Sequence, residues 1–438
     1  MLAAITRKLK ELTRMLGTRP YYGFVTGHGY LTEAQVTEVR RVLESPTQAA
    51  GTVAEYERRF AAVVGDGRGL ATAGGRMALF ATLRALGVGA GHEVILPAFT
   101  CSVVASAVLR TGATPVFTNV DPATFGTDPN AVAKAITPKT RAIIAQHSFG
   151  IPCRVGELRA LADGCGAALI EDCALTVGST RDGVAVGNTG DAAFFSTDHS
   201  KPMNTVVGGF FYTRDAGLYD AVADQLTNAP TLPEAQQRRL FGQFLLERRL
   251  ARPASYGLYQ LAMLGKSVLR RLSDPGMTFL DDDYVVERTG AYAYPARLPA
   301  VLARIGLFEL DRWPAEAARR EALLQRYLTA AYGTPLAAHL PAAYADPALR
   351  IVAHRLAFTH PRADALKSLM DARVHTAWTW FMDPVVGARA GLASLGYAAG
   401  ACPVSERVGT QVLNWPCVVE QGAEDMLLEF FAQVARQA

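Results

Sequence analysis

The residues whose types suggest covalent chemistry are Lys201 and Asp172. Asp172 ends the segment AALIED, whose apolar residues predict a buried strand, and a carboxylate in such surroundings needs a cation nearby. Lys201 stands in a polar turn between two short predicted strands, where a lysine on its own would be an ordinary solvated residue. Together they are the two groups that pyridoxal phosphate (PLP) requires. An imine-forming lysine holds its aldehyde, and a buried aspartate keeps its ring nitrogen protonated as an electron sink.

A phosphate group would find donors near residue 75. Gly74 and Gly75 stand directly before a predicted helix, so the backbone can approach an anion closely and the helix N-terminus offers free N–H groups. Arg76 is suited to add a charged, bidentate contact. Ser196, five residues before Lys201, supplies a hydroxyl on the same structural element as the lysine. These four residues are the expected phosphate contacts.

The elements that must position these residues follow a regular pattern. Between about residues 69 and 213, apolar runs such as EVILP, RAIIAQ and AALIED predict strands, and segments such as RMALFATLRALG predict helices between them. This alternation indicates an α/β protein with a mostly parallel sheet covered on both faces. Ligands of such sheets lie beyond the carboxyl ends of the strands, and those ends carry Thr100, Asp121, His147 and Asp172.

Several segments resemble the DegT/StrS family of PLP-dependent sugar aminotransferases in order and spacing. They include ALGVGAGHEVILPAFT, GATPVFTNVDPATF, IEDCA, VGNTGDAAFFSTDHSKPMNTVVGG and RLPAVLARIGLFELDRW, and cover residues from about 50 to 213 and from about 290 to 438. The resemblance implies the fold-type-I PLP-transferase fold, with a large domain built on a mostly parallel sheet and a smaller C-terminal α/β domain. It also implies that Lys201 binds PLP, that Asp172 holds the ring nitrogen and that Ser196 contacts the phosphate.

The chain departs from the family pattern at positions expected to surround the cofactor. Leu175 stands where a glutamine or histidine near the ring hydroxyl is usual, and Cys101 where an aromatic residue often stacks on the ring. The tripeptide Gly74-Gly75-Arg76 replaces a serine-glycine-threonine cradle, and Pro295 replaces an asparagine that reaches across the dimer. These replacements keep the imine and the electron sink, but they leave the tuning of the cofactor and the identity of the substrate open.

Three further residues are candidates for substrate contacts. His147 ends a predicted strand, where it either lines the pocket or is a satisfied structural histidine. His199, two residues before Lys201, is either an acid/base group or a polar turn residue. Arg297 matches an arginine of the family pattern and is included on that resemblance.

The sequence divides into four expected regions. Residues 1–50 form a helical lead-in, and residues 51–213 form the large PLP-binding domain. Residues 214–290 form a helical insertion that is longer than the usual family connection, and residues 291–438 form the small domain.

The bulk composition excludes several classes of protein. With 44 basic and 40 acidic residues, the net charge of +4 gives no reason to expect nucleic-acid binding. The six cysteines form no C-x-x-C pair, so we expect buried reduced thiols and no metal site. The N-terminal segment MLAAITRKLKELTRMLG is a basic amphipathic helix rather than a secretory signal. It packs on another subunit or contacts a membrane surface, and we expect a cytoplasmic protein.

The resemblance implies a PLP-dependent aminotransferase. It would move an amino group from glutamate or glutamine to a keto sugar carried on a nucleotide, in polysaccharide or glycosylated natural-product biosynthesis, and it would work as a homodimer with sites at the interface. Three alternatives stay open. They are an aminotransferase for a ketone that is not a sugar, a PLP-dependent sugar dehydratase and a catalytically inactive family member. The presence of Lys201 argues against the dehydratase, because known dehydratases on this scaffold lack the lysine.

Overall fold

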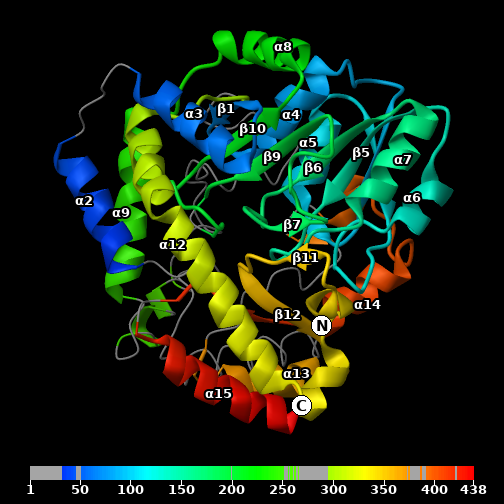
Figure 1. The fold of residues 1–438 in the computed structure, drawn as a ribbon. Helices are drawn as coiled ribbons and strands as arrows, with labels where there is room; N and C mark the ends of the chain where they lie inside the picture. The colour runs from blue at the N-terminus through cyan, green and yellow to red at the C-terminus, as the bar shows by residue number, and fades with distance from the viewer. Residues whose placement is uncertain are drawn as a thin grey trace.

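The computed structural model shows two packed α/β regions joined by one long helix (Figure 1). It describes residues 32–45, 51–198, 200–250, 255, 257–259, 261–262, 265, 294–371, 373–374, 385–386, 391–419 and 422–438. His199 and the basic N-terminal segment lie outside the described residues, so the expectations for them are not addressed by the structure.

The main sheet has seven strands among the described residues, in the order β1-β10-β9-β6-β5-β2-β4. Five neighbouring strands, β9 to β4 in that order, run parallel, whereas β10 is antiparallel to both β9 and β1. The strands are β1 (Arg68–Thr72), β2 (Glu93–Pro97), β4 (Thr114–Thr118), β5 (Thr140–Gln146), β6 (Ala168–Asp172), β9 (Ala192–Ser196) and β10 (Gly209–Thr213). The predicted alternation of helices and mostly parallel strands is confirmed.

Helices cover both faces of this sheet because neighbouring strand residues point to opposite sides. Leu96 of β2 packs in the core with α4, α5 and α8, whereas Ile95 packs on the other face with α6 and α7. These helices are α4 (Gly75–Ala85), α5 (Ser102–Arg110), α6 (Pro129–Ala135), α7 (Val155–Cys165) and α8 (Ala216–Thr227). Fully buried strands therefore read as continuous apolar runs, which is the pattern visible in the sequence.

Helix α12 (Ala300–Ala331) connects the two regions, as Figure 1 shows. Its first half packs with α3 (Thr52–Val64) in the core under the sheet, through residues such as Leu302 and Ile305. Its second half packs in the core of the small domain through Leu323 and Tyr327. The boundary between the two regions therefore lies inside α12 rather than at residue 291.

The small domain packs a two-stranded antiparallel sheet against helices. The strands are β12 (Arg355–Thr359) and β14 (Val412–Pro416), and the helices are α13 (Ala363–Met370), α14 (Pro403–Gln411) and α15 (Glu424–Gln437). Short elements complete the described fold. They are β3 (Thr100–Cys101), β7 (Thr180–Arg181), β8 (Val184–Ala185), β11 (Leu349–Arg350), β13 (Val385–Val386), η2 (Pro335–His339), η3 (Ala342–Ala345) and η4 (Leu392–Leu395).

The region expected as an insertion, residues 214–290, begins with two helices in the structure. Helix α8 packs on α4 and contributes Val222 and Leu226 to the core of the sheet, so it is part of the large domain. Helix α9 (Glu234–Leu250) lies beside α2 (Glu33–Glu44). Within the described part of the chain, no helix is both long and apolar enough to span a bilayer.

Candidate active site

Asp172 ends β6 at the carboxyl edge of the parallel strands and is only 5% exposed. Its Oδ1 accepts a hydrogen bond from the Ala174 N–H at 3.0 Å. Burial raises the pKa of the carboxyl to about 6, although that N–H and the charges of Lys201 and His147 act in the opposite direction. A carboxylate held in this way is destabilised until a cation reaches it, and a protonated ring nitrogen is such a cation.

Lys201 lies in a tightly bonded turn between β9 and β10. Asp198 Oδ1 accepts hydrogen bonds from the Ser200 N–H at 2.8 Å and from the Ser200 hydroxyl at 2.5 Å, and the Lys201 N–H donates to the Asp198 carbonyl at 3.1 Å. The base of the turn is closed by the hydroxyls of Thr197 and Thr205, 2.7 Å apart. The charge of Lys201 acts on the pKa of Asp172. The structure therefore brings together the lysine and the aspartate that were selected from the sequence.

The expected phosphate contacts also come together. Helix α4 begins at Gly75, directly against the end of β9: a Cβ atom added at Gly75 would lie 2.9 Å from the Phe195 carbonyl oxygen and 3.2 Å from Ser196 Cβ. A Cβ at Gly74 would lie 3.5 Å from the guanidinium carbon of Arg76. The free N–H groups of the helix, one hydroxyl and one guanidinium therefore share one small region, as a bound phosphate requires.

Cys101 lies near Lys201 and Arg76, and Leu175 packs in the hydrophobic cluster that Cys101 borders. Burial raises the pKa of the Cys101 thiol, and the positive charges of Lys201 and Arg76 partly offset this effect. Leu175 is 4% exposed and packs in the cluster that contains Phe99. The site thus offers a thiol and an aliphatic side chain where the family pattern has an aromatic ring and a polar group.

Polar atoms at the end of β2 support the presence of a ligand here. The hydroxyls of Thr100 and Ser102, on either side of Cys101, are buried and have no hydrogen-bond partner among the described residues. Unpaired buried polar groups are costly and uncommon in folded proteins. With the cradle, the buried Asp172 and the nearby lysine, these atoms fit the donor and acceptor set that PLP needs.

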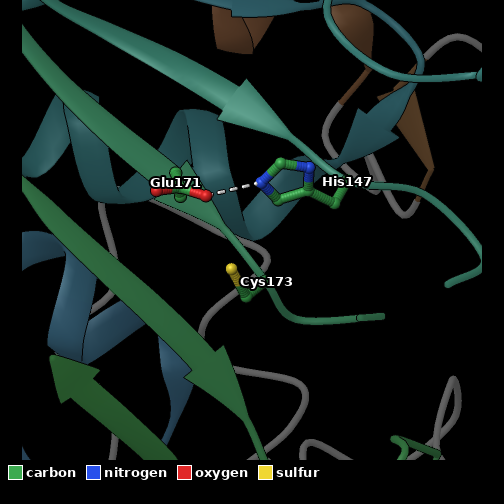
Figure 2. Close-up of side chains that lie close together, drawn as sticks. All are labelled: His147, Glu171 and Cys173. Carbon is green, nitrogen blue, oxygen red and sulfur yellow. Dashed lines mark hydrogen bonds and ion pairs between the residues drawn. The ribbon is translucent and has the colours of Figure 1, made fainter. Parts of the chain in front are cut away.

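His147 does not line the pocket, which corrects one of the two interpretations of this residue. Its side chain is 0% exposed, and Nε2 lies 2.9 Å from Glu171 Oε2 (Figure 2). Its Nδ1 accepts a hydrogen bond from the Cys153 N–H at 3.0 Å. Both ring nitrogens are therefore engaged inside the protein. Glu171 precedes Asp172 on β6, so the two side chains point to opposite faces of the sheet. His147 is a structural histidine behind the site.

His147, Glu171 and Cys173 also form a group whose ligand atoms lie within 4.8 Å of one another (Figure 2). Besides His147, Glu171 accepts N–H groups from Gly187 at Oε2 and from Thr189 and Gly190 at Oε1, each at 2.7 Å. Hydrogen bonds thus account for the whole arrangement of the carboxylate and the imidazole. We therefore treat the group as a structural network rather than as a metal centre.

Arg297 pairs with Thr72 at the end of β1, the outer strand of the main sheet, through an isolated β-bridge. Its Nε donates to the Ala229 carbonyl at 2.7 Å, and its side chain lines an open cavity of about 660 Å³ together with Glu57 of α3. Burial raises the pKa of Glu57 to about 7. Within this chain, the structure does not bring Arg297 to the residues around Lys201.

Two residues near Lys201 were missed by the sequence analysis. Arg320 of α12 donates from Nη2 to the Pro202 carbonyl at 2.9 Å, and the ring of His354 lies close enough to Lys201 to be affected by its charge. Both come from the small domain, far from Lys201 in the sequence. No spacing or local motif links them to the lysine, so no local signal was available.

Comparisons with known proteins show the family of the chain. Residues 30–427 match the DegT/DnrJ/EryC1/StrS aminotransferase family. The chain belongs to this family. Aminotransferases of the family depend on PLP, so the expected fold type and the expected cofactor are both confirmed.

Curated relatives of the family show the range of its chemistry. The chain is 31% identical to the spore coat polysaccharide biosynthesis protein SpsC of Bacillus subtilis over 68% of this chain and 66% of the relative. It is 34% identical to an L-glutamine:2-deoxy-scyllo-inosose aminotransferase of Streptomyces fradiae over 58% of each chain. The matched segments therefore span less than two thirds of the length of these relatives.

A solved structure has the same fold over most of the chain. The structure of DesV from S. venezuelae, in complex with a ketimine intermediate, is 26% identical, has a TM-score of 0.67 and covers 92% of this chain and 95% of that chain. This likeness extends to both domains, so the family fold includes the small domain that contacts Lys201.

Proposed function

We propose that this protein is a PLP-dependent aminotransferase that transfers an amino group from glutamate or glutamine to a keto sugar carried on a nucleotide. The observation that carries the proposal is the pairing of a buried, poorly compensated Asp172 with Lys201 beside a glycine-rich helix N-terminus. This combination offers a lysine for the cofactor, a carboxylate for its ring nitrogen and N–H groups for its phosphate.

Each side chain then has a defined task. PLP supplies an aldehyde and a ring that withdraws electrons when it is bound. Asp172 keeps the ring nitrogen protonated, because the buried carboxylate gains most when a cation is beside it. With PLP bound, the Lys201 amine, once released from the aldehyde, would take the proton from the donor's α-carbon and deliver a proton to the cofactor carbon that carries the nitrogen, and the second half-reaction would run this transfer in reverse. The N–H groups at Gly75 and the Ser196 hydroxyl hold the phosphate.

A ketone that is not a sugar is the second candidate substrate. The relative from Streptomyces fradiae acts, by its name, on 2-deoxy-scyllo-inosose rather than on a nucleotide sugar. Leu175 replaces a polar residue of the family pattern and Cys101 replaces an aromatic ring, and both changes favour a different acceptor. Lys201 continues to argue against a dehydratase.

A homodimer is part of the proposal. Fold-type-I enzymes build their sites where two subunits meet, so residues of a second copy would complete the pocket near Lys201. Sedimentation or light scattering of the purified protein at several concentrations tests this, and a monomer that transfers amino groups would contradict it.

The decisive experiment is the visible absorption spectrum of the purified protein with PLP, before and after adding glutamate or glutamine. We expect an imine band that the amino donor bleaches and that a suitable keto acceptor restores. Lys201→Ala should lack this behaviour, whereas Lys139→Ala, which changes an exposed lysine, should retain it. No PLP band in the wild-type protein, even with excess cofactor, would contradict the proposed function and favour an inactive family member.

Amino transfer to a panel of nucleotide-linked keto sugars and to a carbocyclic ketone then separates the two substrate classes. Turnover of the nucleotide sugars supports the first proposal. Turnover of the carbocycle alone supports the second.

A further inference from the structure

The turn that carries Lys201 is held from the small domain by a buried arginine. Arg320 of α12 donates from Nη2 to the carbonyl of Pro202 at 2.9 Å, and from Nε to Glu316 Oε1 at 3.0 Å. Its side chain is only 4% exposed. An ion-paired guanidinium in a dry environment is a rigid donor, so the carbonyl that follows Lys201 is fixed relative to α12.

A histidine of the small domain lies against the same turn. His354 directly precedes β12 and is 2% exposed. Its main chain is fixed on both sides, because its N–H donates to the Phe149 carbonyl at 3.3 Å and its own carbonyl accepts from the Cys417 N–H at 3.3 Å. The ring therefore projects from a fixed backbone position.

The surroundings of the His354 ring are cationic. Burial lowers the pKa of the imidazole well below its usual value, and the charges of Arg355, Arg320 and Lys201 act in the same direction, whereas the backbone of Ser200 acts against them. The ring is therefore neutral at physiological pH. A neutral imidazole offers one N–H donor and one lone pair at the position where the turn of Lys201 passes.

The polar atoms of this contact are incompletely used. Three buried atoms have no hydrogen-bond partner among the described residues. They are the two ring nitrogens of His354 and Nη1 of Arg320. Leaving such atoms unpaired costs about 1–3 kcal/mol each, so their concentration beside one turn calls for a reason. Both residues also reach the turn of Lys201, Arg320 through its Nη2 bond to the Pro202 carbonyl and His354 through its position beside Ser200.

We propose that His354 and Arg320 are positioning residues for Lys201, which hold its turn from the small domain so that the lysine amine meets the aldehyde carbon of PLP. In that step a C=N bond replaces the C=O bond, and the carbonyl oxygen leaves as water with the two hydrogens of the neutral amine. This inference rests on the proposed binding of PLP. It does not depend on the later transfer of an amino group.

The test compares two measurements on cofactor-free protein. The first is the rate of imine formation after mixing with PLP, followed by visible absorption. The second is the affinity for pyridoxine 5′-phosphate, which carries an alcohol in place of the aldehyde and so binds the cradle without using Lys201. A positioning role changes the first and not the second, whereas general damage to the domain contact changes both.

We expect His354→Leu to slow imine formation by about tenfold or more, which corresponds to about 1.4 kcal/mol in the barrier. Arg320→Met should act in the same direction. His354→Gln, which keeps a polar side chain of similar length beside the turn, should retain most of the wild-type rate. The affinity for pyridoxine 5′-phosphate should stay within about twofold of the wild-type value in all three variants.

Two matched controls come from the same domain. Arg319→Met removes an arginine that also bonds to Glu316 but reaches Glu424 and not the turn, and His360→Gln changes another buried histidine of the small domain. Both should form the imine at the wild-type rate. Since Arg320→Met and His354→Gln are independent variants, failure of His354→Leu to fold would still leave a decisive comparison.

Three results would overturn the inference. They are an unchanged rate in both His354→Leu and Arg320→Met, a parallel loss of pyridoxine 5′-phosphate binding in both, and the absence of imine formation in the wild-type protein. A wild-type protein that forms the imine but transfers no amino group would contradict the proposed function alone, because the imine forms without any amino donor.

Discussion

Two neighbouring carboxylates on β6, Glu171 and Asp172, have opposite surroundings. Glu171 is completely buried, yet its pKa is lowered, because the hydrogen bond from His147 and backbone N–H groups outweigh the effect of burial. Asp172 is buried nearly as deeply but accepts one backbone N–H, and burial raises its pKa to about 6. The protein supplies several donors for Glu171 and only one for Asp172, the residue proposed to pair with the ring nitrogen of PLP.

The two faces of the sheet at β6 therefore differ in how well buried polar groups are hydrogen-bonded. Behind β6, the network around Glu171 fixes the loop at residues 187–190 through main-chain N–H groups. In front of β6, the residues around Lys201 have unpaired polar atoms and a carboxylate with a raised pKa. A preorganised site stores unfavourable electrostatics that a cofactor relieves when it binds.

The largest expected effect is that of replacing Asp172. Asp172→Asn should lower the rate of amino transfer by about 10³-fold, because a neutral amide no longer stabilises the protonated ring nitrogen. The measurement is single-turnover bleaching of the cofactor band by glutamate or glutamine. Thermal unfolding of the cofactor-free variant should show no loss of stability. Retention of full activity would show that Asp172 has no role at the ring.

A second prediction concerns pH. Because the pKa of Asp172 rises from 3.8 to about 6 on folding, the carboxylate destabilises the folded protein above the unfolded value, by up to about 3 kcal/mol at pH 7. Cofactor-free wild-type protein should therefore lose stability relative to Asp172→Asn as pH rises from 4 to 7. Chemical denaturation at each pH measures this difference. Parallel curves for the two proteins would contradict it, and bound PLP should remove it.

A third prediction concerns Glu171 and the stability of the fold. Glu171→Gln should lower the free energy of unfolding by about 2 kcal/mol, because the Thr189 and Gly190 N–H groups and His147 lose a charged acceptor while staying buried. Urea denaturation measures it, with Asp172→Asn as the neighbouring control. The folded fraction should still bind PLP. A change in activity without a change in stability would reverse the roles assigned to these two residues.

The smallest expected effect concerns the phosphate cradle. Ser196→Ala should weaken PLP binding by roughly fivefold to tenfold, the loss of one hydrogen bond to a charged group. Equilibrium dialysis of the cofactor measures the affinity. Thr213→Ala on the next strand, whose hydroxyl bonds to the Asp191 carbonyl, is a suitable control and should leave the affinity unchanged.

Local patterns predicted much of the fold but not its longest helix. The segment ARLPAVLARIGLFELDRW has apolar residues at helical spacing up to Trp313, and α12 continues from there through Pro314 to Ala331. A proline inside a helix removes one N–H donor and ordinarily ends it. Here the two halves pack in different cores, through residues such as Leu302 and Leu323, and this packing maintains the helix across the proline.

The sequence by itself determined the strand and helix alternation, and it led to the proposal of Lys201 and Asp172 as the pair at the carboxyl edge of the sheet. These follow from short-range periodicity and from residue types with few alternative uses. Only the tertiary structure decided that His147 is saturated by Glu171, that Arg297 lies away from the lysine, and that Arg320 and His354 reach the lysine turn. Such contacts join residues far apart in the chain, so only packing brings them together.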